Sequence, residues 1–227
     1  MHHSRKIFGI AVCAVSSAFL GATGRAAAAD TIPAYMTASV SDPGRTPDDF
    51  THDAARKPAE LMAFGRLKPG MVIAEFFPRG GYYTRLLSKL AGSKGKVYAL
   101  SPMRAGYPNP QAIAKERDEL IRQGKTVPPD PYGATVAVQN ISMYANVVPM
   151  LEMLSQYNGQ FSVPEQVDAV WSADGQHDIH SKLFGVGTMM PAVNAAVFAS
   201  MKPGGFYLVE DFAAVRGSGS AAVEGLD

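Results

Sequence analysis

Two short stretches of the chain carry the side chains that could do chemistry. The first, EFFPRGG (75–81), places the acid Glu75 before a turn that contains Arg79, Gly80 and Gly81. A glycine-bearing turn between a strand and a helix puts the free N–H groups of the helix at the sheet edge, where an anionic group can bind. A plain packing turn has a similar composition, so this stretch alone leaves both interpretations open.

The second stretch, ADGQHDIH (173–180), is the densest polar cluster in the chain. His177, Asp178 and His180 could supply a general base, the carboxylate that orients it, and a second polar contact. His and Asp are also metal ligands, but neighbouring side chains point in different directions in most backbones and no distant partner cluster is visible. We therefore predict no metal here. The alternative is that Asp174 or Asp178 caps the following helix.

An alternation of strands and helices must position both stretches. Short apolar runs predict five strands, at 71–75, 96–100, 135–139, 167–173 and 206–212. Helices are predicted at 53–65, 82–91, 109–123, about 144–157 and 189–201. Strands that are apolar throughout and separated by helix-length segments predict an α/β fold with a parallel sheet covered on both faces. Both polar stretches then follow strands, at the carboxyl edge where ligands bind in such sheets.

The N-terminus has the features of a secretory signal. Arg5 and Lys6 precede an apolar run, IFGIAVCAVSSAFLGA, and small residues follow it. We predict cleavage after Ala29, so that residues 1–29 are a signal peptide and the mature protein is periplasmic or secreted. A retained membrane anchor is the alternative, but glycines and serines interrupt the run and it is short for a span. No stable membrane insertion is expected after cleavage.

Composition limits the classes of function for the mature chain. Cleavage removes Cys13, the only cysteine, which excludes disulfides and thiol catalysis. It also removes three of the 21 basic residues and no acidic residue, which leaves 18 bases against 20 acids and a net charge of −2. Nothing in this balance indicates a nucleic-acid partner.

The remaining length suggests one domain with short extensions. We expect an exposed lead-in at 30–52, a domain at 53–212 and a flexible tail at 213–227 that is rich in Gly, Ala and Ser. A closing antiparallel strand pair would not fit in that tail. The sheet should therefore stop at about five strands, and its open edge could pair with a second chain in a homodimer.

Three separated segments together resemble one family. They are RKPAELMAF with LKPGMVIAEFFPRGGYYTRLLSKLAGSKGKVYAL, then VWSADGQHDIH, then AVFASMKPGGFYLVEDFAAVRGSG. In this order they resemble class I S-adenosylmethionine-dependent methyltransferases, and more narrowly a bacterial subgroup of predicted methyltransferases with secretory signals. The resemblance covers about residues 53–219. It implies a Rossmann-like doubly wound sheet, S-adenosylmethionine as cofactor and methyl transfer to a small-molecule substrate.

The chain differs from the pattern of this family at its C-terminus and in the turn after the first strand. The family continues past the fifth strand with a helix and two strands, so this chain resembles a truncated member without the usual C-terminal antiparallel strands. The superfamily turn reads acid-x-Gly-x-Gly-x-Gly, and the matching positions are Glu75, Phe77, Arg79 and Gly81, with Gly80 as an extra glycine. Members of the subgroup tolerate a bulky residue at the position of Phe77. Arg79 is the larger departure: its guanidinium could reach the cofactor carboxylate or occupy the cofactor space.

Further cofactor contacts are expected from the same resemblance. Glu75 would face the methionine amino group, and Tyr82 or its neighbour Tyr83 would face the site from the start of the helix. Ser101 stands where nucleotide-binding sheets often have an acid for the ribose hydroxyls, and Asn140 could contact the adenine. The missing ribose acid and Arg79 motivate an alternative, a non-catalytic exported protein of the same fold that binds another small ligand or a partner protein.

Overall fold

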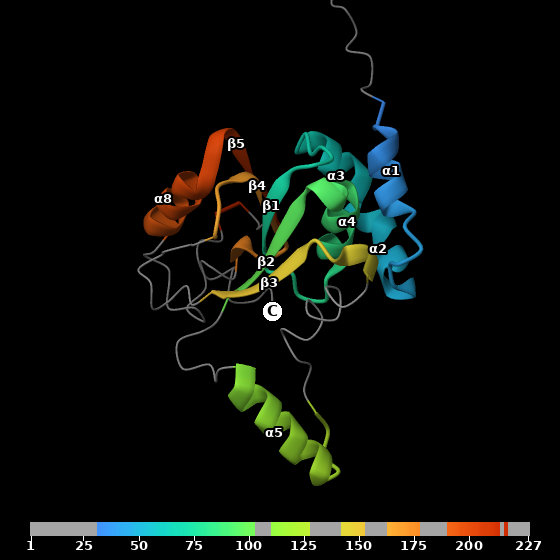
Figure 1. The fold of residues 1–227 in the computed structure, drawn as a ribbon, viewed down its shortest axis with the longest axis vertical. Helices are drawn as coiled ribbons and strands as arrows, with labels where there is room; N and C mark the ends of the chain where they lie inside the picture. Colours follow the sequence, from blue (N-terminus) through green and yellow to red (C-terminus); the bar gives the residue numbers. More distant parts are fainter. Residues whose placement is uncertain are drawn as a thin grey trace, which may run out of the picture. The chain divides into compact units, whose positions relative to one another are not determined.

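The sheet that positions both polar stretches has five strands, and all of them are parallel (Figure 1). The computed structural model describes residues 31–102, 110–127, 142–152, 163–177, 190–213 and 216–217. The strands are β1 (Val72–Phe76), β2 (Lys96–Pro102), β3 (Val147–Glu152), β4 (Val167–Ala173) and β5 (Met201–Glu210). Their order across the sheet is β3-β2-β1-β4-β5. The predicted α/β, Rossmann-like parallel sheet is confirmed.

The direction of the strand order changes at β1. Glu75 on β1 lies between Ala99 of β2 and Trp171 of β4. In open α/β sheets ligands bind outside the carboxyl ends of the strands, at such a switch point. The turn after β1 and the loop after β4 therefore flank the place where the topology predicts a ligand.

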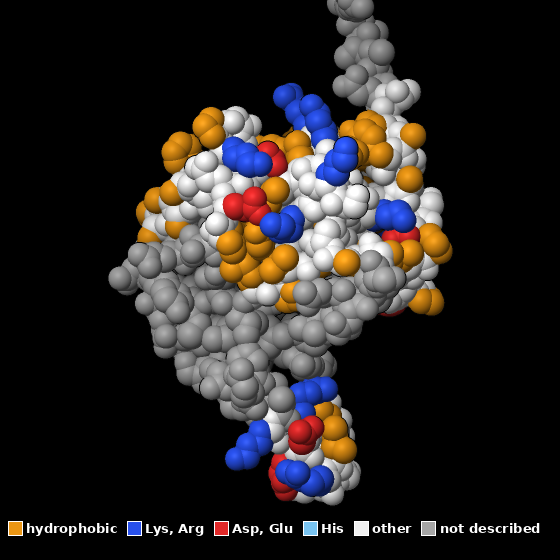
Figure 2. Space-filling view, in the orientation of Figure 1, with side chains coloured by type: hydrophobic (Ala, Val, Ile, Leu, Met, Phe, Trp, Pro, Cys, Tyr) orange, Lys and Arg blue, Asp and Glu red, His pale blue; other side chains and the backbone are white. Residues whose placement is uncertain are grey.

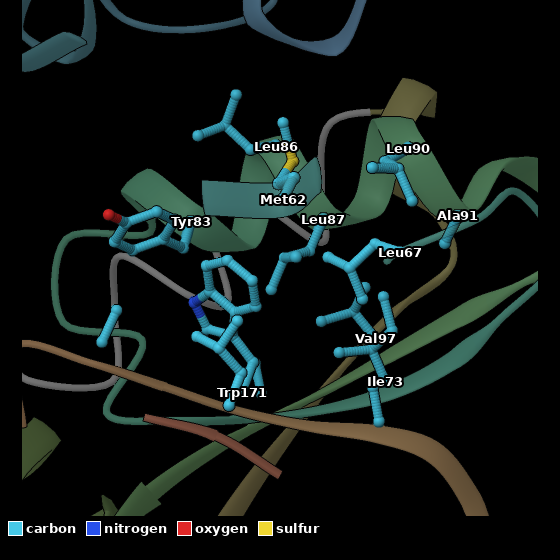
Figure 3. Close-up of a cluster of buried hydrophobic side chains, with 14 of the residues drawn as sticks. Met62, Leu67, Ile73, Tyr83, Leu86, Leu87, Leu90, Ala91, Val97 and Trp171 are labelled. Carbon is cyan, nitrogen blue, oxygen red and sulfur yellow. The ribbon is translucent and has the colours of Figure 1, made fainter. Parts of the chain in front are cut away.

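Three helices cover one face of the sheet: α1 (Ala34–Val40), α3 (Pro58–Phe64) and α4 (Tyr82–Ala91). α4 begins and ends where the helix 82–91 was predicted, and its apolar side chains lie in the core (Figure 3). Trp171 is fully buried beneath this helix, with its indole 5.3 Å from the ring of Tyr83. The leucines that follow the turn recur at helical spacing, and their side chains pack α4 against the sheet.

The other face is covered by α8 (Met190–Ser200), which confirms the helix predicted at 189–201. Val193 and Val197 of α8 pack with Ala74 and Phe76 of β1. Successive side chains of a strand point to opposite faces, so Ile73 belongs to the first core and Ala74 to the second. This alternation explains why β1 and β4 carry apolar side chains on both faces.

The predicted lead-in at 30–52 is helical in the structure. Besides α1, it contains the start of α2 (Pro47–Arg56). The Thr46 hydroxyl accepts a hydrogen bond from the Asp49 N–H, and the Asp49 carboxylate accepts one from the Thr46 N–H. This capping box, with proline at the first helical position, starts the helix at Pro47 and not at residue 53.

The predicted first helix, 53–65, is divided between α2 and α3. Lys57 ends α2 with φ of +43°, and Pro58 is the first residue of α3. Proline has no N–H to donate and disfavours the α conformation of the residue before it. A single helix therefore cannot pass through this point.

The third strand lies further along the chain than predicted. β3 occupies Val147–Glu152, within the predicted helix 144–157, and a 3₁₀ turn (Ser142–Tyr144) precedes it. The strand predicted at 135–139 lies outside the described residues. Pro149 explains the error: we read it as a kink in a helix, but β3 lies at the edge of the described sheet, where a strand tolerates a residue without an N–H.

The remaining elements agree with the sequence more closely. α5 (Pro110–Arg122) lies within the helix predicted at 109–123, and the 3₁₀ turn Gly92–Lys94 precedes β2. β5 starts at Met201, earlier than the predicted 206, and ends at Glu210. The domain boundaries at residues 29, 52 and 212 stay predictions.

Two surface properties bear on partners. Basic and acidic side chains are interspersed on the face that Figure 2 shows. Among the described residues, no helix is both long enough and apolar enough to cross a membrane. β3 and β5 are the edges of the described sheet, and pairing of an edge in a homodimer stays a prediction.

Candidate functional site

The turn after β1 keeps a glycine-type backbone although two of its three glycine positions hold other residues. Phe77, Arg79 and Gly81 have φ values of +57°, +45° and +79°. Positive φ is the conformation for which glycine is normally used, and in other residues it is strained. The acid-x-Gly-x-Gly-x-Gly pattern therefore persists in the backbone at all three positions. Gly80, the extra glycine, has no such requirement, because a Cβ there would meet nothing within 4 Å.

A pocket of about 240 Å³ opens beside this turn, at the switch point of the sheet. It is bounded by the turn, the start of α4, the end of β4 and one side of α2. Of the predicted cofactor residues, the lining includes Glu75, Phe77, Arg79, Gly80 and Tyr82. The structure thus brings five of the predicted cofactor residues to one pocket.

Glu75 is the buried acid of this pocket. Only 2% of its surface is exposed, and one carboxylate oxygen accepts a hydrogen bond of 2.7 Å from the Thr84 hydroxyl. Burial raises the pKa of Glu75 to about 8, although the Thr84 bond and the nearby Arg85 guanidinium favour the charged form. The raised pKa favours the protonated carboxyl near neutral pH, and a cation beside it would favour the carboxylate.

This raised pKa predicts a pH dependence of stability. The unfolded chain loses the Glu75 proton near pH 4.5 and the folded chain near pH 8, so the contribution to folding is complete below the lower value and is lost as pH rises toward the upper one. Glu75→Gln cannot titrate. The free energy of unfolding of the variant relative to wild type should rise by more than about 1 kcal/mol between about pH 5 and about pH 8 in urea titrations. Parallel pH profiles for the two proteins would contradict this.

α2 supplies a side of the pocket that the sequence analysis missed. Asp48, Asp49, His52 and Arg56 line it, together with Thr46 at the helix N-terminus. The signal for these residues was present as the capping box TPDD, but we placed this segment in the exposed lead-in. A helix that starts at Pro47 carries polar side chains on one face at the spacing of helical turns.

Charged contacts hold α2 to α4. The Arg85 Nε donates to Asp49 Oδ2 at 2.6 Å, and Arg85 Nη2 donates to the backbone oxygen of Gly80 at 3.2 Å. The Tyr82 hydroxyl donates to Asp53 Oδ1 at 2.7 Å, and burial raises the pKa of Tyr82. Tyr82 therefore joins the two helices at the pocket edge.

Tyr83 is the tyrosine whose hydroxyl lacks a partner of good geometry. The residue is 5% exposed and lines the pocket, and its hydroxyl makes no hydrogen bond of ordinary geometry within the described parts of the chain. Burial raises its pKa to about 12. A buried hydroxyl without such a bond is costly unless a ligand or water satisfies it, so Tyr83 indicates a polar occupant of the pocket.

Phe77 and Arg79 are placed differently although both have strained backbones. Phe77 is buried with Phe76 in the second core, and a Cβ added at Gly175 would lie 2.6 Å from its ring. Arg79 is exposed at the pocket rim. The phenylalanine side chain is thus part of the wall between the turn and the loop after β4.

The other three predicted cofactor residues are not in the described lining. Gly81 ends the turn as the N-cap residue of α4. Ser101 is buried in β2 beside Leu151 of β3 and is absent from the described lining. Asn140 lies outside the described residues. Their proposed contacts with ribose and adenine stay predictions.

His177, our candidate base, is oriented by a residue that we missed. Its Nδ1 lies 2.7 Å from Asp211 Oδ1, and its backbone N–H donates to Asp211 Oδ2 at 2.7 Å. The side chains of His177 and Asp211 are 9% and 15% exposed. We assigned the orienting role to Asp178, which lies outside the described residues, as does His180. The available signal was the acid that follows β5, the strand beside β4.

The expectation that no distant partners join His177 is also wrong. Asp174, which follows β4 with φ of +57°, and Asp211 both approach it, with one ligand atom from each of the three within 4.8 Å of the others. Asp174 also lines the pocket and lies 3.4 Å from the guanidinium of Arg56. The polar cluster after β4 and the turn after β1 therefore meet at Asp174.

The solved structures that are similar to this chain share little sequence with it. No protein-family model and no curated protein matches the chain. Among solved structures it is similar to an S-adenosylmethionine-dependent methyltransferase from Aquifex aeolicus, with 18% identity over 72% of this chain and 69% of that one and a TM-score of 0.41. It is also similar to Aeropyrum pernix fibrillarin with bound S-adenosylmethionine, with 16% identity over 63% and 46% of the two chains and a TM-score of 0.35.

A protein-L-isoaspartate O-methyltransferase is a third such structure, with 18% identity, a TM-score of 0.36 and coverage of 66% of this chain. The chain spans 34% of that protein's length and less than half of the fibrillarin's.

Proposed function

We propose that this protein binds S-adenosylmethionine in the switch-point pocket and transfers its methyl group to a small nucleophile. One observation carries the proposal: three positive φ values stand at the three glycine positions of the turn, directly after the buried acid Glu75. A strained backbone at two non-glycine residues costs about 1–3 kcal/mol each and usually persists where function requires the shape. The strand order places this turn where open α/β sheets bind nucleotides.

The residues present fit the amino-acid end of the cofactor. Glu75 would pair with the ammonium group, and the Tyr83 hydroxyl would gain a hydrogen-bond partner. No side chain caps the N-terminus of α4 at Gly81, so its first N–H groups can receive a carboxylate. Arg79 at the rim could contact the same carboxylate.

The bound cofactor would supply an electrophilic methyl group on a sulfonium. The chain's own task is then to orient the acceptor and to take up its proton. His177 is held by Asp211 and lies near Asp174 at the pocket wall. We propose that the imidazole of His177 receives the acceptor's proton, and that Asp211 fixes the ring in the orientation required.

The size of the pocket favours a second candidate. Its volume of about 240 Å³ is below the roughly 300–1,000 Å³ of most small-molecule sites. A small zwitterion, such as a free amino acid, would satisfy Glu75, Tyr83 and the N-terminus of α4 without reaching Ser101. Such a protein would be the non-catalytic binding protein that the sequence left open.

Calorimetric titration separates these functions. The first proposal expects saturable binding of S-adenosylmethionine, weakened about tenfold or more in Glu75→Gln, because a hydrogen bond to a charged group contributes about 1.5–3 kcal/mol. Glu165→Gln, an exposed acid paired with Lys96, serves as the control and should bind like wild type. Binding of methionine alone, with no gain from the adenosyl group, supports the second candidate. No heat with either ligand at millimolar concentration contradicts both.

Proton release gives a further prediction from the same pocket. Burial raises the pKa of Glu75 to about 8, and a bound ammonium group would favour its carboxylate form. Binding should therefore release a proton and tighten as pH rises from about 6 to about 7.5. Titrations in two buffers of different ionisation enthalpy measure the released proton. Equal heats in both buffers would argue against an ammonium group beside Glu75.

Export is part of the proposal as well. A charged start, an apolar run and a small-residue site support cleavage after Ala29. The mature protein would then begin at Asp30, and N-terminal sequencing of the protein from the periplasm or the medium tests this. A chain that retains residues 1–29 in the membrane fraction would contradict export as a free protein.

A further inference from the structure

The side chains at the ends of β4 and β5 form a cluster with the composition of a metal site. Asp174 and His177 follow β4, and Asp211 follows β5. These strands pair in parallel up to Ala173 and Glu210, and the Asp174 N–H donates to the Glu210 oxygen at 3.0 Å. The parallel register therefore ends both strands at one level and brings three ligand-type side chains together.

The three ligand atoms are already close to a chelating arrangement. One atom from each side chain lies within 4.8 Å of the other two. The His177 Nδ1 and Asp211 Oδ1 are 2.7 Å apart. Bonds of about 2.0–2.2 Å to one ion at tetrahedral or octahedral angles need a separation of roughly 3 to 3.5 Å. A small outward shift of either group would admit an ion in place of the shared proton.

Fixed contacts hold the ligands in this arrangement. Asp211 accepts hydrogen bonds from the backbone N–H groups of His177 and Phe212, at 2.7 and 2.8 Å. The ring of Phe212 packs against the imidazole with 5.9 Å between centroids. Backbone donors to a ligating carboxylate orient it as the outer contacts of metal sites do.

Charge at the cluster favours a cation. Asp174, Glu210 and Asp211 bring three carboxyl groups to one place, and Arg56 lies 3.4 Å from Asp174. The Arg56 guanidinium is the cation described in contact with Asp174. Two carboxylates with a neutral imidazole would balance a doubly charged ion.

An independent observation indicates a polar occupant beside the cluster. The Tyr83 hydroxyl is buried without a hydrogen bond of ordinary geometry in the described chain, and Asp174 and Glu210 both act on it electrostatically. A water molecule on an ion at Asp174 would supply a partner for such a hydroxyl.

We infer that Asp174, His177 and Asp211 bind a divalent transition-metal ion such as Zn²⁺ or Mn²⁺. An imidazole with two carboxylates suits these ions, whereas Mg²⁺ and Ca²⁺ prefer oxygen ligands alone. Binding of the ion does not depend on S-adenosylmethionine. An ion at Nδ1 would replace the hydrogen bond through which Asp211 orients the imidazole, so the ion-bound protein and the protein in which His177 acts as the base are two distinct forms.

The test is metal titration of the full chain after treatment with a chelator. His2 and His3 are first replaced with alanine, because an N-terminal histidine pair would bind metal by itself. Calorimetry should show one Zn²⁺ or Mn²⁺ per chain. His177→Ala should weaken binding by more than the ~10–100-fold that loss of an outer contact produces. Glu165→Gln, a control at an exposed acid that is paired with Lys96, should leave binding unchanged.

Two further measurements keep the inference open to contradiction if His177→Ala folds poorly. Asp211→Asn keeps the shape of the side chain and should also weaken binding. Co²⁺ added to the chain with His177 intact should give visible absorption bands of a nitrogen- and oxygen-ligated site that Zn²⁺ abolishes. Absence of saturable binding, or binding that is unchanged in both variants, would overturn the inference. Cofactor binding is measured separately with Glu75→Gln, so the two proposals can fail independently.

Discussion

Replacing Arg85 with methionine is expected to lower the free energy of unfolding by about 3–5 kcal/mol. Arg85 and Asp49 are both buried and form a two-bond ion pair between α4 and α2. Methionine fills similar space but leaves the Asp49 carboxylate buried with the Thr46 N–H, at 3.0 Å, and the more distant Arg45. The uncompensated charge, and not the loss of packing, is the reason for the large effect. Urea unfolding measures it.

Two controls separate this explanation from general damage. Arg122→Met removes an exposed ion pair with Glu119 on α5 and should cost less than about 1 kcal/mol. The double variant Asp49→Leu with Arg85→Met removes both charges and should recover most of the lost stability. If the double variant is as unstable as the two single variants added together, the buried charge is not the cause.

Replacing Phe77 and Arg79 by glycine should have opposite effects on stability. Both residues have positive φ, so glycine relieves a strain of about 1–2 kcal/mol at either position. Phe77 is buried in the core with Phe76 and Tyr98, and loss of such a ring costs about 3–5 kcal/mol. Phe77→Gly should therefore destabilise by about 2–3 kcal/mol. Arg79→Gly should be neutral or stabilise by up to about 1 kcal/mol, since Arg79 is exposed and glycine adds freedom to the unfolded chain.

Gly175 provides the matched test of the geometry. A Cβ at this position would lie 2.6 Å from the Phe77 ring, so Gly175→Ala should destabilise wild type and be tolerated in the Phe77→Gly background. The cycle of single and double variants measures this coupling by thermal unfolding. A loss of stability in Arg79→Gly as large as that in Phe77→Gly would contradict the assignment of strain to the backbone.

Much of the fold could be predicted because periodicity and burial agree. Apart from Glu75, Asp168 and Ser172, the residues of Val72–Phe76 and Val167–Ala173 are apolar, because both faces of the sheet are covered. The leucines of α4 recur at helical spacing because one side of that helix faces the sheet. These are local patterns with one structural solution, so the sequence predicted their elements to within a residue.

The errors arose where tertiary context decides between local alternatives. Residues 147–152 contain a proline, which a kinked helix and an edge strand both accept, and only the neighbouring β2 makes the segment a strand. Residues 47–56 have the capping signature of a helix, but proline and acidic residues around it also suit an exposed segment. Propensity is a weak prior in both cases.

The sequence predicted the site residues that lie in continuous motifs, but not the residues that reach the site from remote segments. Glu75 and the turn follow from one continuous motif, and His177 stands in the densest polar stretch of the sequence. Asp211 and Asp49 reach the site from remote segments, through strand order and through the packing of α2. Spacing in sequence contains no information on either approach, so only the folded chain shows these partners.

The most direct test of the central claim is a crystal structure of the chain with S-adenosylhomocysteine. The account predicts that the amino group of the ligand lies at hydrogen-bond distance from Glu75. Its carboxylate should face the first N–H groups of α4, with the turn at 77–81 keeping its three positive φ values. Crystals grown with a saturating concentration of the ligand would contradict the account if the side chains of Phe77 and Arg79 fill the pocket and the ligand is absent or bound at another part of the sheet.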